Sequence, residues 1–371
     1  MEKFDTIIIG LGAMGSATAY SLSQQQKVLG LEQFTLAHTF GSSHGETRAI
    51  REAYFEDPVY VPMVQRAYHN WFALEKKAQT SLLKQVGGLM IGSPQGIVVQ
   101  GSEKSAVEHN LPYERIDSST IKNRFPFFNP DENMIGIWEP RAGILLVEKC
   151  ISTYLELAKE QGAKLNFSEK ALSWGASGND ITVTTTRNSY SAKNLVLTAG
   201  AWLGDLFPFI KQHLTIERQV QLWFESEKKC ENCPVNIWEY KPGYFFYSLP
   251  DVGGGVKVSL HHNGQHTTAN SINREVCQNE DVTPVQDLIR TYLPYINPQV
   301  IRSSVCMYTN TVDGHFLLDH HPQHNNVWIV SPCSGHGFKF SSVIGEIVTS
   351  LVTTGESPFP LERFSLRRLL S

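Results

Sequence analysis

The sequence lacks the features of a membrane or exported protein. No apolar run is long enough to span a bilayer, and the short apolar run at residues 6–9 leads straight into a glycine turn instead of a secretory cleavage site. The last residues, Arg367-Arg-Leu-Leu-Ser371, are not the usual peroxisomal tripeptide. We therefore expect a cytoplasmic protein with no membrane partner.

Basic residues and cysteines are too few for two other classes of protein. The 32 lysines and arginines are outnumbered by 36 acidic residues, and a formal net charge of −4 gives no positive excess for binding nucleic acid. Six cysteines in 371 residues do not make a disulfide scaffold. Cys230 and Cys233 form a Cys-x-x-Cys motif, but no second Cys/His pair stands at a spacing that would complete a zinc site. We interpret this motif as a surface turn, with a metal or redox role as the alternative.

The most informative feature that is present lies at the N-terminus. The apolar run Thr6-Ile-Ile-Ile is followed by Gly10-Leu-Gly12-Ala-Met-Gly15, a helix-like segment and a second apolar run that ends at Glu32. In a βαβ unit, Gly10 permits the tight turn, Gly12 lets the backbone approach a pyrophosphate, and Gly15 lets the helix pack on the strand. Glu32 would then accept hydrogen bonds from ribose hydroxyls. This order predicts a dinucleotide site, with a glycine turn of another α/β protein as the alternative.

Apolar periodicity predicts the other elements. We expect helices at 58–78, 147–161, 283–293 and 338–353, and strands at 85–101, 143–147, 164–167, 180–186, 194–198, 218–262, 302–308 and 327–330. Dinucleotide-type elements occur at the start, the middle and the end of the chain, with β-rich segments between them. We therefore predict an α/β fold with a discontinuous Rossmann-type cofactor domain (1–77, 139–212 and 313–371) and a β-sheet-rich α+β substrate domain (78–138 and 213–312).

Two groups of basic residues are candidates for binding anions. Ser334-Gly-His336-Gly-Phe-Lys339 places a glycine loop and a lysine directly before a helix. Its convergent N–H groups suit an electron-rich group, although helix capping beside a solvated lysine fits equally well. Arg48 and Arg51 suit bidentate contacts to carboxylate or phosphate, with ordinary surface arginines as the alternative.

Two other positions are candidates for chemistry beside a cofactor. Lys257 and His261 are four residues apart on an expected strand, so their side chains share a face, which lines either a cleft or the solvent. Cys306, in an apolar strand, is either a packing residue or a nucleophilic thiolate, and the local sequence does not decide between them.

Taken together, these residues closely resemble the monomeric sarcosine oxidase family and its relatives, which include N-methyltryptophan, pipecolate and fructosyl-amino-acid oxidases. The resemblance covers nearly the whole chain. It is carried by the N-terminal fingerprint and by four further motifs: Gly45-Glu-Thr-Arg48 with Arg51, Ala199-Gly-Ala-Trp202, Val305-Cys-Met-Tyr-Thr309 and Ser334-Gly-His-Gly-Phe-Lys-Phe-Ser-Ser342.

The resemblance implies FAD as the cofactor, bound by the Rossmann-type domain and attached covalently through an 8α thioether to Cys306. It implies that Arg51 and Lys339 hold the substrate carboxylate, that Arg48 and Lys257 lie near the flavin, and that Lys257 activates oxygen. His261 is expected to act with them, and Tyr247, Tyr308, Gly335 and His336 to surround the substrate. The implied cofactor-binding residues are Gly10, Gly12, Ala13, Met14, Gly15, Glu32, Ser43, His44, Arg48, Cys306, Met307, Gly337, Phe338 and Lys339.

The implied reaction is the oxidation of a secondary amino acid, N-methylated or cyclic, by FAD and O2 to an imine and hydrogen peroxide. A related flavin amine dehydrogenase or a fructosyl-amino-acid oxidase is the alternative. The resemblance further implies a monomer that needs no metal. Three residues depart from the family pattern, namely Glu52, Phe55 and Trp238, and each either reshapes the substrate site or faces away from it.

Overall fold

The N-terminal apolar run forms the centre of a sheet in the computed structural model, which describes all residues except 227–232, 263, 332 and 371. Strand β1 (Glu2–Ile9) lies parallel to β2 (Val28–Leu31) on one side and to β12 (Ser189–Leu197) on the other. Next to them, β9 (Lys164–Asn166) pairs with β2, and β20 (His324–Ser331) with β12, again in parallel. Three antiparallel strands complete this first sheet: β10 (Ala171–Ser177), β11 (Asp180–Thr185) and β19 (Leu317–His321).

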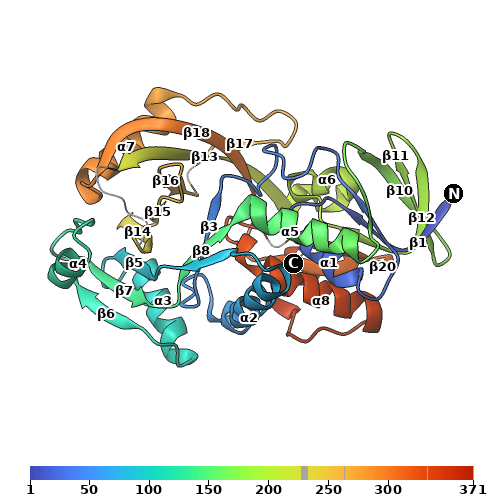
Figure 1. Cartoon of the computed structure of the whole chain (residues 1–371), viewed down its shortest axis with the longest axis horizontal. Coiled ribbons are helices and arrows are strands. Elements are labelled where there is room, and N and C mark those ends of the chain that lie inside the picture. The colour runs from blue at the N-terminus through green and yellow to red at the C-terminus, as the bar shows by residue number, and fades with distance from the viewer. Residues whose placement is uncertain (227–232, 263, 332, 371) are drawn as a thin grey trace.

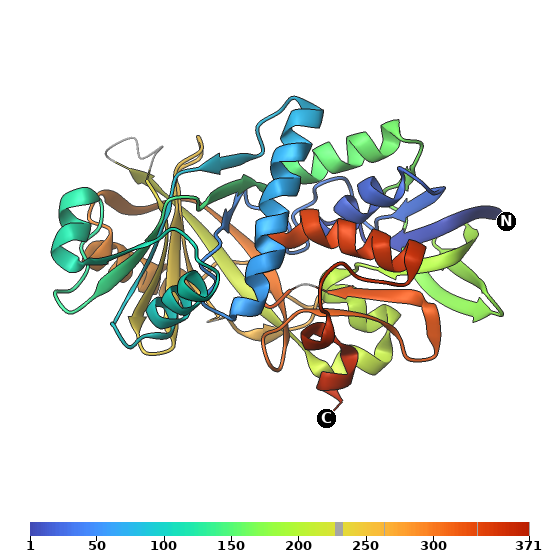
Figure 2. The ribbon, with the colours of Figure 1, turned by 90° about the horizontal axis from the view of Figure 1, so that it is seen from below.

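Helices cover one face of the first sheet (Figures 1 and 2). Helix α1 (Ala13–Leu22) lies between α5 (Val147–Glu160) and α8 (Ser341–Thr354). The strand residues alternate between two cores, because Ile8 packs into the helical side whereas Ile7 and Ile9 pack into the other. Both faces of β1 are therefore buried, as expected for a parallel sheet.

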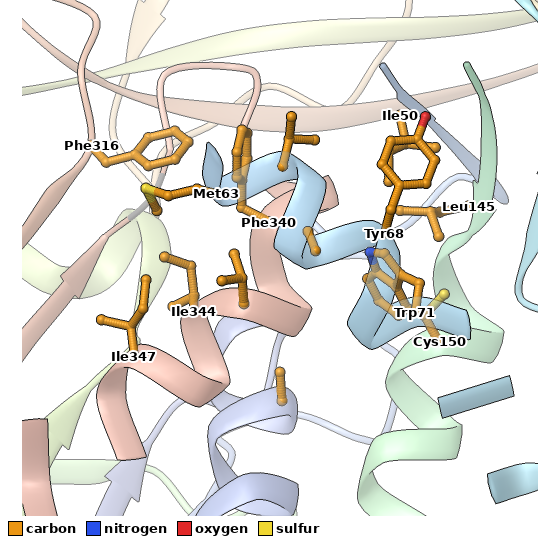
Figure 3. Packing of buried hydrophobic residues seen from close by; sticks show 14 of the residues in the cluster. Ile50, Met63, Tyr68, Trp71, Leu145, Cys150, Phe316, Phe340, Ile344 and Ile347 are labelled. Atoms are coloured by element: carbon orange, nitrogen blue, oxygen red, sulfur yellow. The ribbon is translucent and has the colours of Figure 1, made fainter. Parts of the chain in front are cut away.

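Helix α2 (Val61–Ala78) packs across α8 and α5. Figure 3 shows Met63 and Trp71 of α2 beside Ile344 of α8 and Cys150 of α5, all of them buried. The indole N–H of Trp71 also donates to the carbonyl oxygen of Lys339, at 2.9 Å. This packing fixes the loop that precedes α8.

The second sheet lies at the other end of the molecule (Figure 1). Its strand order is β17 (His266–Thr267), β13 (Leu214–Ser226), β16 (Val256–His261), β15 (Tyr244–Leu249), β14 (Val235–Lys241), β5 (Gly88–Gly92), β7 (Ile135–Glu139) and β6 (Glu114–Asp117), and the long β18 (Ile296–Thr311) also pairs with β13. The helices packed around it are α3 (Ile97–Glu108), α4 (Ser118–Arg124) and α7 (Thr283–Tyr292).

A small antiparallel sheet lies between the two large ones (Figure 1). Its strands are β3 (Thr47–Ile50), β8 (Gly143–Leu146) and β4 (Leu83–Gln85). Strand β3 carries Arg48 and leads directly to Arg51, so both arginines come from the junction of the large sheets. The short remaining helices are η1 (Pro58–Tyr60), η2 (Gly200–Trp202), α6 (Leu203–Leu206), η3 (Pro208–His213), η4 (Gln278–Val282), η5 (Phe338–Phe340), η6 (Glu362–Phe364) and η7 (Leu366–Leu369).

The sequence-based elements are confirmed for the N-terminal βαβ unit and for the helices at 58–78, 283–293 and 338–353. The strand expected over 85–101 is wrong after residue 92, because α3 begins at Ile97. Val98 and Val99 are β-branched, a type common in strands, but here they are buried together with Ser102 and Ala106, which is the spacing of one helix face. The predicted domain boundaries stay a prediction. In the described part of the chain, no helix combines the length and the apolar character that crossing a membrane requires.

Candidate functional site

One long cavity runs from the glycine turn of the first sheet to the face of the second. The residues that line it come from β1, β3, β13, β15, β16, β18 and the loop before α8. Most of the predicted site residues are among them: Gly10, Gly12, Ala13, Met14, Glu32, Ser43, Arg48, Arg51, Tyr247, His261, Cys306, Met307, Tyr308, Gly335, His336, Gly337, Phe338 and Lys339.

The glycine turn has the geometry that its sequence predicts. Gly10 has a φ of +96°, and a Cβ there would lie 2.6 Å from the carbonyl oxygen of Thr198. A Cβ on Gly15 would lie 1.7 Å from the carbonyl oxygen of Gly10, so Gly15 lets α1 pack directly on β1. By contrast, a Cβ on Gly12 would meet no close contact, because the nearest atom is the side-chain oxygen of Ser43, 3.5 Å away. This is the place where a pyrophosphate can approach the backbone.

Glu32 lies at the cavity wall but is partly engaged. Its carboxylate accepts backbone N–H groups from Leu11, at 2.9 Å, and from Phe34, at 3.0 Å, and His38 lies 3.5 Å away. Burial opposes ionisation of this carboxyl, but these partners outweigh burial and lower its pKa. Glu32 is therefore an anion whose hydrogen bonds stabilise the glycine turn, and it also lines the cavity.

One face of the second sheet carries the residues that meet the cavity. Cys306 pairs with Gln219 across β18 and β13, and Ser304 pairs with Gln221, so these four side chains share a face. Cys306 is a free thiol that is only 2% exposed. It stands at the cavity wall and not in a closed core.

Tyr308, His261 and Gly335 close another part of the cavity. Nδ1 of His261 lies 3.0 Å from the hydroxyl of Tyr308. Gly335 has a φ of +79°, and a Cβ there would lie 2.7 Å from the Tyr308 ring and 3.0 Å from His261. Burial, together with the neighbouring His262, lowers the pKa of His261 well below its usual value. His261 is therefore a neutral hydrogen-bonding group.

Two side chains near Cys306 have buried polar atoms without partners. Both amide atoms of Gln221, a cavity-lining residue that is 1% exposed, make no hydrogen bond to the residues that the structure describes. The same holds for Nε2 of His44 within those residues. Burial and the charge of Arg48 lower the pKa of His44 to about 3. Buried polar atoms normally have partners, so these atoms mark a place for a polar ligand.

Lys257 lies beside this face, opposite Trp223. It is 1% exposed, and its Nζ donates to the carbonyl oxygens of Gly45, at 2.8 Å, and Thr47, at 2.5 Å. Burial and the nearby Arg48 lower its pKa well below the usual value for lysine. The ammonium group is thus tied to the loop that leads into β3.

Arg51 is not free to bind an anion in this structure. One of its terminal nitrogens, Nη2, donates to both carboxylate oxygens of Glu56, at 2.7 and 2.6 Å, and Nη1 donates to the carbonyl oxygen of Ala53, at 3.1 Å. The guanidinium also lies over the rings of Tyr54 and Phe55, 4.3 and 4.4 Å from their centroids. Burial opposes the charge on Glu56, but Arg51 outweighs burial and lowers the pKa of this carboxyl.

Lys339 is the second buried cation of this region. Its Nζ donates to the carbonyl oxygen of His336, at 2.7 Å, and to the hydroxyl of Tyr54, at 3.3 Å. Nε2 of His336 lies 3.0 Å from the carbonyl oxygen of Gly314, which can only accept, so Nε2 carries the proton. Nδ1 therefore accepts a hydrogen bond from the Tyr54 hydroxyl, at 2.6 Å. Burial and the charge of Arg51 lower the pKa of Lys339 to about 7.

Three predicted site residues lie beside the cavity and do not line it within the described residues: Gly15, His44 and Lys257. Gly15 packs the helix, His44 lies near Ser304, and Lys257 holds the β3 loop. The sequence analysis missed Glu56, Gln221 and Tyr54. Glu56 follows Arg51 by five residues in an acidic, aromatic loop, and that spacing is its only signal.

The three residues that depart from the family pattern lie in different environments. Phe55 lines the cavity and stacks near Phe245, with ring centroids 6.2 Å apart. Trp238 does not form a wall of the cavity: it is fully buried in the core of the second sheet, because it faces away from its cavity-lining neighbour Ile237. Glu52 is buried, and its carboxylate lies 3.4 Å from Arg141.

The Cys-x-x-Cys motif is described only in part, since Cys230 lies outside the described residues. Cys233 is 2% exposed and disulfide-bonded, so it is not the exposed turn residue that we expected. The described residues contain no group of three or more His, Cys, Asp or Glu side chains that could hold a metal ion.

The sequence matches a family model described as "FAD dependent oxidoreductase" (DAO) over residues 5–351. It is 39% identical to monomeric sarcosine oxidase from Streptomyces avermitilis, covering 99% of this chain and 98% of that protein. It is 31% identical to N-methyl-L-tryptophan oxidase from Yersinia pestis, covering 98% and 99%.

Among solved structures, NikD, an unusual amino acid oxidase essential for nikkomycin biosynthesis, has a TM-score of 0.87 at 20% identity and covers 98% of each chain. This likeness confirms the α/β fold class with its mixed sheets.

Proposed function

The chain belongs to the family of FAD dependent oxidoreductases, and from this premise we propose that it oxidises secondary amino acids, such as sarcosine, to an imine and hydrogen peroxide. One observation carries the proposal: the glycine turn, Cys306, Arg51 and Lys339 line a single cavity although they are spread over more than 300 residues of sequence. A dinucleotide site, a thiol and two buried cations together suit a flavin and a carboxylate-bearing substrate.

The residues present fit FAD. The backbone at Gly12 is open to a pyrophosphate, and the N-terminal N–H groups of α1 follow it. The unpartnered amide of Gln221 lines the cavity on the same sheet face as Cys306 and suits a polar ring system. Cys306 is the residue that we propose to carry the flavin through a thioether.

Arg51 and Lys339 would bind the substrate carboxylate. Two cations that fix one anion also fix the adjacent C–N bond, and this is catalysis by proximity. Glu56 occupies Nη2 of Arg51, so a substrate carboxylate that bonds to this nitrogen has to displace it. Tyr247, Tyr308, His261 and Gly335 form the walls around the rest of the substrate.

FAD bound in this cavity would supply the two-electron acceptor for the amine, with O2 as the final electron acceptor. Lys257 and Arg48 contribute positive charge where oxygen gains electrons. The pKa of Lys257 is depressed by burial and by Arg48, so a developing negative charge nearby would favour the protonated lysine. The neutral His261 adds no positive charge that would disfavour binding of the amine.

Purified protein tests the covalent flavin directly. We expect a yellow protein whose colour stays with the polypeptide after acid precipitation, and we expect acid to release the flavin from Cys306→Ser. Release of the flavin from the unchanged protein would reject the thioether.

An aerobic panel of sarcosine, N-methyl-L-tryptophan, pipecolate, proline and fructosyl-valine tests the reaction. Peroxide formation with at least one of them supports an oxidase. Flavin reduction without peroxide would support a dehydrogenase instead, and no reduction by any of them would reject the proposed substrate class. Size-exclusion chromatography with light scattering tests the proposed monomer.

A further inference from the structure

A buried carboxylate at the end of β7 accepts hydrogen bonds from the turn that follows β3. Glu139 is 1% exposed, and its Oε1 accepts the backbone N–H of Glu52, at 2.6 Å. Its Oε2 accepts the next backbone N–H, that of Ala53, at 2.9 Å. These two charge-assisted hydrogen bonds join residues 86 and 87 positions apart in sequence.

The turn that Glu139 holds carries the groups proposed to bind the substrate. Nη1 of Arg51 donates to the carbonyl oxygen of Ala53, so the position of the guanidinium depends on the residue whose N–H Glu139 holds. The next residue, Tyr54, places its hydroxyl 3.3 Å from Nζ of Lys339. A single carboxylate thus supports the backbone behind both cationic partners.

The neighbouring carboxylate does not share this task. Glu52 is buried, but neither of its oxygens accepts a hydrogen bond from the described residues, and its partner is Arg141, at 3.4 Å. The charged and titratable groups that act on Glu139 are Arg51, Glu52 and Tyr68, and Arg141 lies beside Glu52. Burial raises the pKa of Glu139 to about 7 against the pull of the two N–H donors.

We propose that Glu139 is a positioning residue for carboxylate recognition: when ionised, it holds the peptide N–H groups of Glu52 and Ala53, so that Arg51 is presented to the cavity. Protonation turns one carboxyl oxygen into an O–H donor and makes it a weaker acceptor, so it weakens the hold on one of the two N–H groups. The inference rests on the proposed function for the role of Arg51. The hydrogen bonds that Glu139 accepts from the turn do not depend on that function.

The test is a titration of the flavin-loaded protein with acetate, in which the change in flavin absorbance reports binding. Acetate is a carboxylate without an amine to oxidise. In Glu139→Gln we expect the Kd for acetate to rise about tenfold, the change that follows from one lost charge-assisted hydrogen bond. Glu139→Asp, which keeps the charge, should recover part of this loss. An unchanged Kd in folded Glu139→Gln would overturn the proposal.

Glu239→Gln is the matched control. Glu239 is also buried and also accepts two backbone N–H groups, from Val98 and Gly243, both at 3.2 Å, but neither donor belongs to the turn that carries Arg51. We expect its acetate Kd to stay within twofold of the unchanged protein, at the lower edge of measurable effects. An equal rise in both variants would mean a general loss of packing and would overturn the proposal.

The pH profile separates positioning from a purely structural role. In the unchanged protein, acetate affinity should fall on the acid side of pH about 7 as Glu139 takes up a proton, and Glu139→Gln should lose this acid limb. This measurement on the unchanged protein decides the matter even if the variant does not fold: constant affinity through the acid limb would overturn the proposal.

Turnover of sarcosine is measured separately. KM should rise with the acetate Kd in Glu139→Gln while kcat changes less. If no secondary amino acid is oxidised but acetate binding responds as described, the proposed function fails and the role of Glu139 stands.

Discussion

Replacing Glu56 with glutamine would remove the internal anion that occupies Arg51. In the structure, both oxygens of the Glu56 carboxylate accept from the same guanidinium nitrogen, at 2.7 and 2.6 Å. We expect an incoming carboxylate to compete with Glu56 for this nitrogen. The amide of Glu56→Gln keeps nearly the same shape but not the charge, so it is a weaker competitor.

The expected changes have opposite signs for binding and for stability. A hydrogen bond to a charged group contributes about 1.5–3 kcal/mol, so removing the competitor should strengthen acetate binding by about 10- to 100-fold. Breaking a buried ion pair destabilises a protein by about 3–5 kcal/mol, because one charge stays buried without its partner. We expect the lower end, since the Glu56 side chain is 18% exposed, whereas that of Arg51 is 3% exposed.

Two measurements on the flavin-loaded protein check this prediction. A spectral titration gives the acetate Kd, and urea unfolding with and without acetate gives the free energy of unfolding. In Glu56→Gln, acetate should restore most of the lost stability because it replaces the missing anion. The control is Glu346→Gln, which breaks the more exposed ion pair with Arg66 and should change neither quantity by more than about 1 kcal/mol. Acetate binding that is unchanged or weaker in folded Glu56→Gln would refute the competition between the two carboxylates.

Three further predictions concern the cations and the glycine loop. Lys257→Met should leave anaerobic flavin reduction nearly intact and slow reoxidation by O2 at least tenfold, as stopped-flow absorbance will show; equal loss in both half-reactions would contradict a role toward oxygen. Acetate affinity should fall as the pH rises above about 7, because Lys339 loses its proton there, and Lys339→Met should abolish this alkaline limb; a limb that persists belongs to another group. Gly335→Ala should raise KM for sarcosine and destabilise the fold by about 1–3 kcal/mol, because its Cβ would lie 2.7 Å from Tyr308 at a φ of +79°; unchanged KM and unfolding would show that the loop relaxes freely.

The parts of the fold that could be predicted are those whose signal is local. Gly10, Gly12 and Gly15 stand within six residues of one another, and their backbone roles follow from the turn alone. Helix α2 follows from its apolar spacing in the same way. The placement of Cys306 at the cavity wall did not follow from spacing, since its strand is equally consistent with a closed core. That expectation came from the resemblance to a family.

The contacts that sequence reasoning missed are tertiary. Glu139 is 86 and 87 residues away from the two residues whose N–H groups it accepts, and nothing in the sequence of either segment indicates this contact. Glu56 is near Arg51 in sequence, but a loop carboxylate is more often solvated than paired with a buried arginine. For Trp238 the sequence left open whether the side chain reshapes the substrate site or faces away from it. Strand alternation decides this, because Ile237 lines the cavity and its neighbour Trp238 therefore lies on the other face.

That parity has a consequence for how the enzyme can evolve. Strands β14 and β15 pair Ile237 with Tyr247, which line the cavity, and Trp238 with Phe246, whose rings stack in the core at 5.5 Å. Selection on substrate size therefore acts on one set of side chains, and selection on folding acts on the alternate set. Substitutions at Ile237 can accumulate and shift the range of accepted amines while the aromatic core of the sheet stays intact.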